Sequence, residues 1–223
     1  AGLTLANFLQ QQGIAYFIIE KSPVLTSLGA GIVIQKNGLE ILAALGLEKS
    51  LKGNNLCQMS LGNINKLKHI DYRAELPVKA VHRGELQQLL LSRLPREKIY
   101  LGRTIEEVRQ EDKGLQLILS DQEIKYCDLL IEAGGVHAEL HGKAKLTGSG
   151  QHCWRKLITC SDDFEQGAEY WFGKHRLGVI PIGKKQLYVF HVHDGDLTEK
   201  ERLDWLDKML LEQNKQQLLN SLD

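Results

Sequence analysis

The first 23 residues constrain the fold more than any other segment, because they follow the order helix, glycine, apolar strand, acid. Residues 3–12 space their apolar side chains as a short amphipathic helix, Gly13 ends it, and the apolar run 15–19 leads to Glu20. Gly2 and Glu20 are eighteen positions apart (20 − 2). In a Rossmann βαβ unit, the last glycine of the phosphate loop allows close helix–strand packing, and an acid roughly 20 residues later hydrogen-bonds a ribose hydroxyl. The segment therefore predicts part of a dinucleotide-binding unit, although other α/β proteins also place an acid after a helix and a strand.

Charge and hydropathy exclude two classes of partner. The 223 residues include 28 basic and 28 acidic side chains without a basic tract, so we expect no nucleic-acid partner. No apolar run approaches the roughly 18 residues that span a bilayer, and no signal peptide precedes the first helix, so we expect a cytoplasmic protein with no membrane partner. The cysteines lack CxxC spacing and are expected to be reduced structural thiols: Cys57, Cys127, Cys153 and Cys160. The sequence does not define the oligomeric state.

A glycine-rich turn and a second helix continue the α/β pattern. Gly29 and Gly31 precede a short apolar strand, and a helix is expected from Asn37 to about Gly46. Both turn glycines allow a ligand to approach the backbone closely, and a turn that needs positive φ explains them equally well.

A third helix is predicted to begin at Arg83 and to end at Pro95. Its apolar face is formed by Leu86, Leu89, Leu90 and Leu94. A cation at a helix N-terminus opposes the helix dipole, so Arg83 is better explained by an anionic partner than by helix stability. A solvated surface arginine is the alternative.

Strand patterns dominate the rest of the chain. Weak alternation over residues 53–78 predicts strands, and residues 104–110, 115–119 and 123–126 predict a three-stranded meander. The continuous apolar run 128–131 is typical of a buried parallel strand.

The last third of the chain predicts a mixed or antiparallel sheet followed by helix. The strands are expected in the segments CWRKL, YWFGKHRLGVIPI and QLYVFHVH. Residues 198–223 are expected to form one or two amphipathic helices, with Thr198 and Glu201 as a capping box. The buried stripe of this tail would be Leu203, Leu206 and Leu210.

Taken in order, several segments resemble one family over nearly the whole chain: AGLTLANFL, IIEKS, LGAGIVIQKNGLEILAALGL, VHRGELQQLL, DLLIEAGGVHAEL, CWRKL and GVIPI. The family is the FAD-dependent aromatic hydroxylases, single-component flavoprotein monooxygenases that include salicylate, hydroxybenzoate and urate hydroxylases. The resemblance implies an α/β fold (α+β mixed) in which a Rossmann-like FAD-binding domain is interleaved with a β-sheet substrate domain. Residues 1–51 and 80–137 would form the FAD-binding domain without its first strand, and residues 52–79 and 138–223 the substrate domain. The chain resembles a fragment that lacks both ends of the family's arrangement.

The resemblance also implies a set of cofactor-binding residues: Gly2, Glu20, Lys21, Gly31, Arg83, Val108 and Gly135. Gly2 would be the last phosphate-loop glycine, and Glu20 would bind the adenosine ribose with Lys21 beside it. Val108 would place its backbone near adenine. Arg83 is similar to the arginine that reaches the flavin phosphate or ribityl region, which would supply the anionic partner.

The chemistry implied by this resemblance uses FAD as cofactor, NAD(P)H as cosubstrate, O2 and a small aromatic substrate. NAD(P)H would reduce the flavin, O2 would give a flavin hydroperoxide, and an electron-rich ring would be hydroxylated. The cofactor carries the hard step, while the protein orients the substrate and excludes water, so no catalytic side chain is assigned. Arg176 and Tyr188 flank the GVIPI segment and are the expected substrate-binding residues. An exposed strand arginine and a half-buried strand tyrosine are the alternatives.

Departures from the family favour a second hypothesis, a degenerate, non-catalytic binding module. Glu132, Gly134 and Ala138 stand where the family usually has glycine, aspartate and serine, and Leu140 and His141 where it has valine and arginine.

A third hypothesis is a metal site at His191 and His193. These side chains are two residues apart, on one face of a strand, and carboxylates follow at once. Histidine and aspartate are good ligands for zinc or iron. Because the pair lies in a strand that the family resemblance already explains, we expect no metal.

Overall fold

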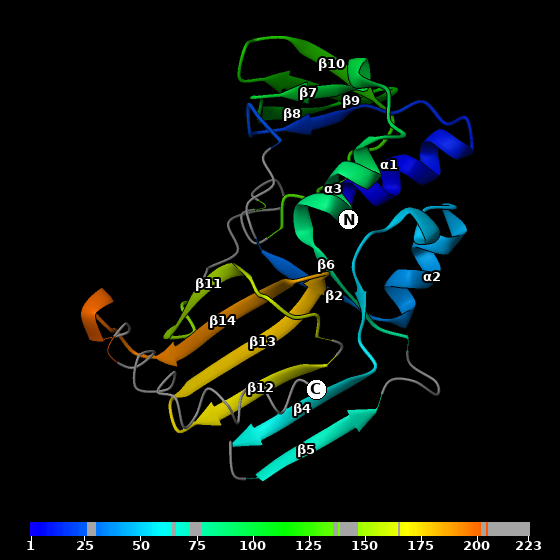
Figure 1. The fold of residues 1–223 in the computed structure, drawn as a ribbon. Coiled ribbons are helices and arrows are strands. Elements are labelled where there is room, and N and C mark those ends of the chain that lie inside the picture. Colours follow the sequence, from blue (N-terminus) through cyan, green and yellow to red (C-terminus); the bar gives the residue numbers. More distant parts are fainter. Residues whose placement is uncertain are drawn as a thin grey trace. The chain divides into compact units, whose positions relative to one another are not determined.

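The computed structural model of the chain divides into two compact units (Figure 1). The structure describes residues 1–25, 30–63, 66–71, 77–135, 138, 147–164, 166–201 and 204. Unit 1 combines residues 1–27 and 87–147, and unit 2 combines residues 28–86 and 148–223. Residues 28–51 and 80–86, which the sequence groups with the cofactor-binding segments, thus fall in unit 2 by their contacts.

Unit 1 contains the helix and strand that the opening segment predicts. Helix α1 (Gly2–Gln11) is followed by strand β1 (Ile18–Glu20). Strand β1 pairs in parallel with β7 (Ile99–Leu101), which follows the short 3-10 helix η2 (Arg96–Lys98). The strand ends at Glu20 as expected, so the acid lies at the carboxyl end of a parallel strand.

A buried asparagine in unit 1 joins α1 to the last turn of helix α3 (Arg83–Leu91), whose residues 87–91 belong to the same unit. Helix α3 begins at Arg83 as predicted, and Leu90 and Leu94 of its expected apolar face are buried. Asn7 of α1 is 4% exposed. Its Nδ2 donates hydrogen bonds to the carbonyl oxygens of Leu3 (2.8 Å) and Leu90 (2.9 Å). The second bond satisfies a carbonyl in the last turn of α3 that has no partner within its own helix.

The predicted meander is present in unit 1. Strands β8 (Ile105–Glu111), β9 (Gly114–Leu119) and β10 (Ile124–Cys127) form an antiparallel sheet in the order β10-β9-β8. Gln122, at the predicted hairpin, has a φ of 67°.

The strand expected over residues 128–131 is wrong. These residues belong to no strand, and Leu129 and Ile131 are 72% and 53% exposed. An apolar run becomes a buried parallel strand only where neighbouring strands and a cover on both faces exist. Within the described residues, no sheet contains a strand that pairs with residues 128–131. The expected turn follows, where Gly135 has a φ of 70°.

Unit 2 contains a small sheet built from residues on both sides of α2. Strands β2 (Gly31–Ile34), β6 (Lys79–His82) and β3 (Asn54–Asn55) pair antiparallel in the order β2-β6-β3. Helix α2 (Lys36–Ala44) follows β2 as predicted, and Gly46, with a φ of 67°, lies just after its end. The 3-10 helix η1 (Glu48–Ser50) precedes β3.

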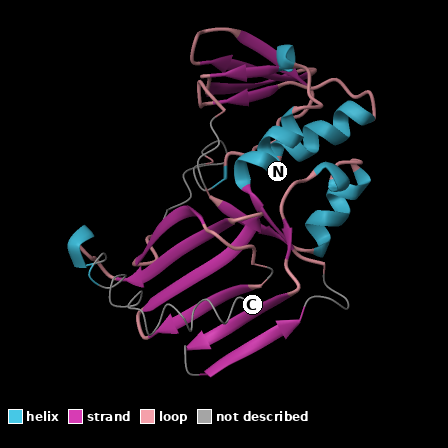
Figure 2. Cartoon of the chain, viewed as in Figure 1, coloured by secondary structure: helices cyan, strands magenta, loops and turns pink. Residues whose placement is uncertain are grey.

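The larger sheet of unit 2 has six strands in the order β11-β14-β13-β12-β4-β5 (Figures 1 and 2). They are β4 (Gln58–Asn63), β5 (Lys66–Asp71), β11 (Gln151–Thr159), β12 (Gly167–Phe172), β13 (His175–Gly183) and β14 (Gln186–Asp194). Strands β12 and β4 pair in parallel, and the other neighbouring strands pair antiparallel. The sheet is therefore mixed, which is one of the two arrangements that the sequence predicts.

Each face of this sheet contributes to a separate apolar cluster. One cluster contains Phe164, Ala168, Tyr170, Leu177, Leu187 and Val189. The other joins the sheet to the small β2-β6-β3 sheet and contains Leu56, Val78, Ala80, Ile180, Ile182 and Tyr188. The second cluster fixes β2 and β6 against the middle of β13 and β14.

The capping box after the sheet is confirmed. The backbone N–H and the hydroxyl of Thr198 both donate to Glu201 Oε2 (2.9 and 2.7 Å), and the Glu201 N–H donates to Thr198 Oγ1 (3.2 Å). The expected stripe Leu203, Leu206 and Leu210 lies outside the described residues. In the described part of the chain, the helices are too short or too polar to cross a membrane.

Candidate functional site

Gly2 lies where a side chain would be crowded. A Cβ atom there would come within 3.3 Å of the Ala133 side chain. Gly2 is the first residue of α1, where unpaired backbone N–H groups and the helix dipole favour an anion. The role of Gly2 as the last phosphate-loop glycine stays a prediction.

Glu20 ends β1 and retains hydrogen-bonding capacity. Its Oε1 accepts a hydrogen bond from the Ser22 N–H at 2.8 Å, which closes a turn directly after the strand. Within the described residues Oε2 accepts no hydrogen bond, so a hydroxyl donor can still bind there. Lys21, beside it, is exposed.

Val108 and Gly135, the other expected residues of unit 1, are accessible. Val108 is 37% exposed on β8, an edge strand, where alternate backbone groups point away from β9. Gly135 has open space where a side chain would be. No hydrogen bond among the described residues joins either of them to Glu20, so their roles stay predictions.

In unit 2, strand pairing brings Gly31 and Arg83 together. Gly31 of β2 lies opposite His82 of β6, and the Arg83 N–H donates to the Ala30 carbonyl at 2.9 Å. His82 Nδ1 accepts a hydrogen bond from the Gly84 N–H at 3.0 Å and so caps α3. The Arg83 side chain is exposed and makes no ion pair within the described residues. Its guanidinium is therefore available for an anion.

Gly31 also contacts the expected substrate residue Tyr188. A Cβ at position 31 would lie 2.5 Å from Tyr188 Cγ, so only glycine fits against this ring. Tyr188 is 9% exposed, and burial raises the pKa of its phenol, an effect that the Arg155 guanidinium partly offsets. The phenol is thus protonated at neutral pH and can donate a hydrogen bond.

Arg176, the second expected substrate residue, lies on the same face of the sheet as Tyr188, but the two side chains are not neighbours. Tyr188 is paired with Ile180, whereas Arg176 is paired with Val192. Four residues along a strand separate the two positions, about 13 Å. Arg176 Nη1 lies 3.6 Å from Glu169 Oε1, so its charge already has a partial partner.

Aromatic and cationic side chains occupy the stretch between these positions. Phe190 lies next to Tyr188, with ring centroids 5.7 Å apart, and its ring covers Gly178 on β13. Arg155 of β11 lies opposite Phe190, and its Nε donates to Cys153 Sγ at 3.3 Å. Sequence reasoning did not find Arg155. The alternating positions of β11 could have indicated it, since they place Arg155 and Leu157 on one face.

Four histidines gather on the opposite face of the same sheet. His152, His193 and His175 are directly paired across β11, β14 and β13, and His191 lies two residues along β14. His175 Nδ1 and His191 Nε2 are 3.0 Å apart and share a hydrogen bond, and His152 Nε2 lies 2.9 Å from Asp196 Oδ1. Over the described ranges, no three histidine, cysteine or acidic side chains are placed to hold a metal ion.

The positions that depart from the family lie after β10. Gly134 packs near Ala138, 3.5 Å from its Cα to the position of an added Cβ, and Glu132 is partly buried. Leu140 and His141 lie outside the described residues.

Solved structures with the same fold include two flavoproteins. HpxO of Klebsiella pneumoniae, complexed with FAD and uric acid, gives a TM-score of 0.78 at 21% identity, over 88% of this chain and 55% of that chain. PqsL of Pseudomonas aeruginosa, in complex with 2-aminobenzoylacetate, gives 0.78 at 15% identity, over 86% and 58%. The α/β arrangement is thus that of FAD-dependent monooxygenases, as the sequence predicts.

Sequence comparison identifies the family. Residues 1–220 match the FAD binding domain family. Aurachin C monooxygenase/isomerase of Stigmatella aurantiaca is 31% identical over 204 residues, which are 85% of this chain and 53% of that protein. 2-Heptyl-3-hydroxy-4(1H)-quinolone synthase of Pseudomonas aeruginosa is 28% identical over 206 residues, again 85% and 53%. The chain belongs to this FAD binding domain family, whose related members are FAD-dependent aromatic monooxygenases, and it spans about half the length of these relatives.

The described residues fit FAD on chemical grounds. A helix N-terminus at Gly2 suits a phosphate, the open Oε2 of Glu20 suits a ribose hydroxyl, and the exposed guanidinium of Arg83 suits a second anionic group. The relatives of this chain named above are enzymes, so the comparisons do not favour the hypothesis of a degenerate, non-catalytic binding module.

Proposed function

We propose that this chain is the cofactor- and substrate-binding part of an FAD-dependent, NAD(P)H-using monooxygenase that hydroxylates an aromatic or similar electron-rich small molecule. The observation that carries the proposal is the contact of Gly31 with the Tyr188 ring. Gly31 lies opposite His82 in the β2–β6 pair, and Arg83 directly follows His82. It brings an expected cofactor-binding backbone against an expected substrate-binding side chain, within one compact unit.

Four side chains have separate tasks in this proposal. Glu20 binds the adenosine ribose through Oε2, and Arg83 binds a phosphate or the ribityl chain. Tyr188 donates a hydrogen bond from its phenol, whose pKa burial raises further, to a substrate oxygen. Arg155 holds an anionic substituent of the ring. When bound, FAD supplies the redox chemistry that takes electrons from NAD(P)H and activates O2.

The aromatic face of the sheet gives the substrate its class. Phe190 and Tyr188 form an aromatic surface of two neighbouring rings whose planes are tilted by 39°. Arg155 lies opposite Phe190 on β11, and its charge acts on the Tyr188 phenol. A planar ring with an acidic or hydroxyl substituent is complementary to this surface. HpxO and PqsL were solved with uric acid and 2-aminobenzoylacetate, both small polar molecules of this kind.

The first test is cofactor retention by the purified chain. After incubation with FAD and desalting, the visible spectrum should show about one flavin per chain. A folded chain that retains no flavin contradicts the proposal.

Two exposed arginines, Arg83 at the start of α3 and Arg96 in η2, provide a matched comparison. Arg83→Gln should weaken FAD binding about tenfold, because a charge-assisted hydrogen bond to an anion is lost. Arg96→Gln removes another exposed positive charge, from η2, and should leave the affinity within about twofold. Equal losses in both variants would mean that Arg83 acts only through net charge.

Turnover is tested with NAD(P)H, O2 and a panel of hydroxyquinolines, aminobenzoates and purines. We expect at least one compound to gain one oxygen atom by mass spectrometry. Arg155→Gln should raise KM for an anionic substrate more than for a neutral analogue of the same ring. Equal effects on both would remove Arg155 from the substrate site.

A further inference from the structure

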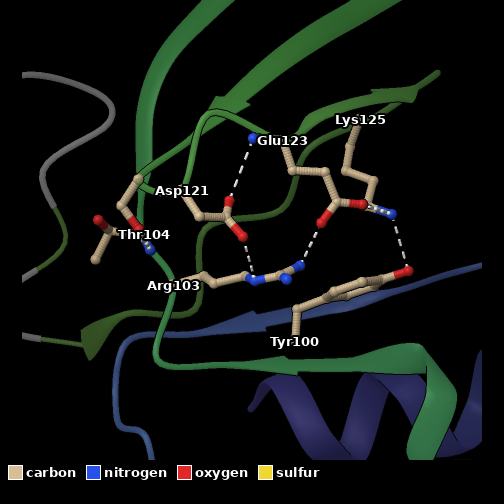
Figure 3. A network of polar contacts seen from close by, with 7 residues as sticks. Tyr100, Arg103, Thr104, Asp121, Glu123 and Lys125 are labelled. Carbon is tan, nitrogen blue, oxygen red and sulfur yellow. Dashed lines mark hydrogen bonds and ion pairs between the residues drawn. The ribbon is translucent and has the colours of Figure 1, made fainter.

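A network of charged side chains surrounds Tyr100 at the end of β7 (Figure 3). It consists of Tyr100, Arg103, Asp121, Glu123 and Lys125, and we call it the Arg103 network. Arg103 follows β7, whereas the two acids and the lysine come from the β9–β10 hairpin and β10. The network therefore ties the three-stranded meander to the parallel β1–β7 pair, all within unit 1.

Both ends of the Arg103 guanidinium are held. Its Nε lies 2.8 Å from Asp121 Oδ2, and its Nη1 donates to Glu123 Oε2 (Figure 3). Lys125 Nζ pairs with the other oxygen of Glu123 and donates to Tyr100 Oη at 3.0 Å. The hydrogen bond from Lys125, with the charge of Arg103, lowers the pKa of Glu123, which keeps the carboxylate ionised.

The two cations of the network, Arg103 and Lys125, both lie over the ring of Tyr100. The Arg103 guanidinium carbon is 5.2 Å and Lys125 Nζ 4.2 Å from the centroid of its ring. Contacts of this kind favour a cation over an aromatic face. The side chain of Arg103, 29% exposed, is thus fixed by two carboxylates and a ring.

The backbone of the same residue holds the turn that follows β1. The Arg103 N–H donates to the Glu20 carbonyl, and the Gly102 N–H donates to the Ser22 carbonyl, both at 3.1 Å. Ser22 in turn donates its N–H to the Glu20 carboxylate. Gly102 has a φ of 68°, a left-handed backbone conformation that favours glycine in this turn. The orientation of the Glu20 carboxylate therefore depends on where residues 102 and 103 lie.

We propose that Arg103 is a positioning residue for the adenosine half of FAD, acting through Glu20. The inference rests on the proposed function, in which Glu20 binds the ribose. By locking residues 102 and 103, the Arg103 network holds Glu20 in its binding orientation before the cofactor arrives. Such preorganisation improves affinity because less ordering is left to occur on binding.

Cofactor affinity gives the first test. Arg103→Gln should weaken FAD binding about fivefold and leave FMN, which lacks the adenosine ribose, within about twofold. Arg103→Lys, which can still bind one carboxylate, should recover part of the loss. Arg109→Gln is the matched control, since it breaks the Arg109–Glu107 ion pair of the same sheet, 2.7 Å long, without contacting the turn.

A double-mutant cycle separates positioning from general stabilisation. In a Glu20→Gln background, Arg103→Gln should have little further effect on FAD affinity, because the group that it positions is already lost. A loss that is the same in both backgrounds, or that includes FMN equally, overturns the proposal.

Amide exchange tests the same idea without any cofactor. In the full chain, the segment 20–25 should exchange about fivefold faster in Arg103→Gln than in Arg109→Gln, because the Ser22 turn loosens. Equal exchange in the two variants overturns the positioning role. A wild-type chain that binds no FAD rejects the proposed function instead, and the exchange result then decides the role of Arg103 alone.

Discussion

At the scale of single residues, Gly31 and Tyr188 each limit the side chain that the other position can carry. The two positions are 157 residues apart in the chain (188 − 31), and the ring of one occupies the space where the other would carry a side chain. Tyr188 is buried in the cluster that joins the two sheets of unit 2. A single methyl group at position 31 therefore has to displace a ring that is packed on several sides.

We expect Gly31→Ala to destabilise the chain by about 1 to 3 kcal/mol, because overpacking moves side chains off their preferred rotamers. Urea denaturation followed by far-UV circular dichroism measures the change. Gly148→Ala is the control, since a Cβ there meets nothing within 4 Å. If the two variants lose the same stability, the contact of Gly31 with Tyr188 is not the cause.

Sequence reasoning identified several of these residues without their partners. It selected Gly31, Arg83 and Tyr188, but the contact between Gly31 and Tyr188 depends on the packing of two sheets. Local patterns do not encode such contacts. Arg155 was missed for the same reason, because only the register of β11 against β14 places it beside Phe190.

At the scale of elements, α1 and α3 are joined by one polar side chain. Asn7 is buried and uses both hydrogens of its amide on backbone carbonyls, one in each helix. This geometry explains a polar residue on the inner face of an otherwise apolar helix.

Replacing Asn7 with alanine should cost about 1 to 3 kcal/mol, since the Leu90 carbonyl is left buried without its donor. The free energy of unfolding in urea measures this loss. Gln10→Ala also removes hydrogen bonds, from Tyr16 and Lys98, but these are exposed and water replaces them. A loss in Gln10→Ala as large as in Asn7→Ala would contradict the explanation.

His175 of β13 should make the stability of the chain depend on pH. Burial lowers the pKa of His175 below its ordinary value of 6.5, and the neighbouring His193 lowers it further, against a smaller opposite effect of Asp194. The unfolded chain then binds the proton more readily than the folded chain. This contribution is present above pH 6.5 and is lost as the pH falls through the lower, folded-state pKa.

Urea midpoints at about pH 7.5 and about pH 5.5 test this expectation. The wild-type chain should lose more stability between the two values than His175→Gln, whose side chain does not titrate. An identical loss in both proteins would mean that His175 does not contribute to the pH dependence.

Elements with a clear local signal were predicted well, and the exception has a physical reason. Alternation predicted β8, β9 and β10 and the hairpin between the last two, since these strands pair with sequence neighbours. Residues 128–131 have the composition of a buried strand, yet Leu129 is largely exposed. A strand of that kind is defined by its neighbours, which its own residues do not specify.

At the scale of the whole molecule, the two compact units should respond separately to substitution. Each contains its own buried residues, and each is assembled from two distant stretches of the chain. Substitutions far apart and without shared partners have nearly additive effects.

Hydrogen exchange followed by mass spectrometry tests this separation. Asn7→Ala should accelerate exchange in residues 1–25 and 87–135, and Gly31→Ala in residues 30–63 and 166–194. Acceleration of both units by either variant would show that they unfold together.

The family-level fold was predictable because the order of segments extends over nearly the whole chain. The assignment of segments to compact units was less predictable from the sequence. Residues 28–51 look like a continuation of the nucleotide-binding pattern, but they make their contacts in unit 2. The cofactor and substrate residues remain predictions that the binding experiments test.

The tight fit of Gly31 against Tyr188 has a consequence for protein engineering. A library that varies position 188 alone to change specificity explores only side chains compatible with glycine at position 31. Smaller residues at 188 leave room for alanine or serine at 31, which would alter the backbone next to Arg83. Redesign of the substrate surface is therefore better conducted as paired randomisation of these two codons.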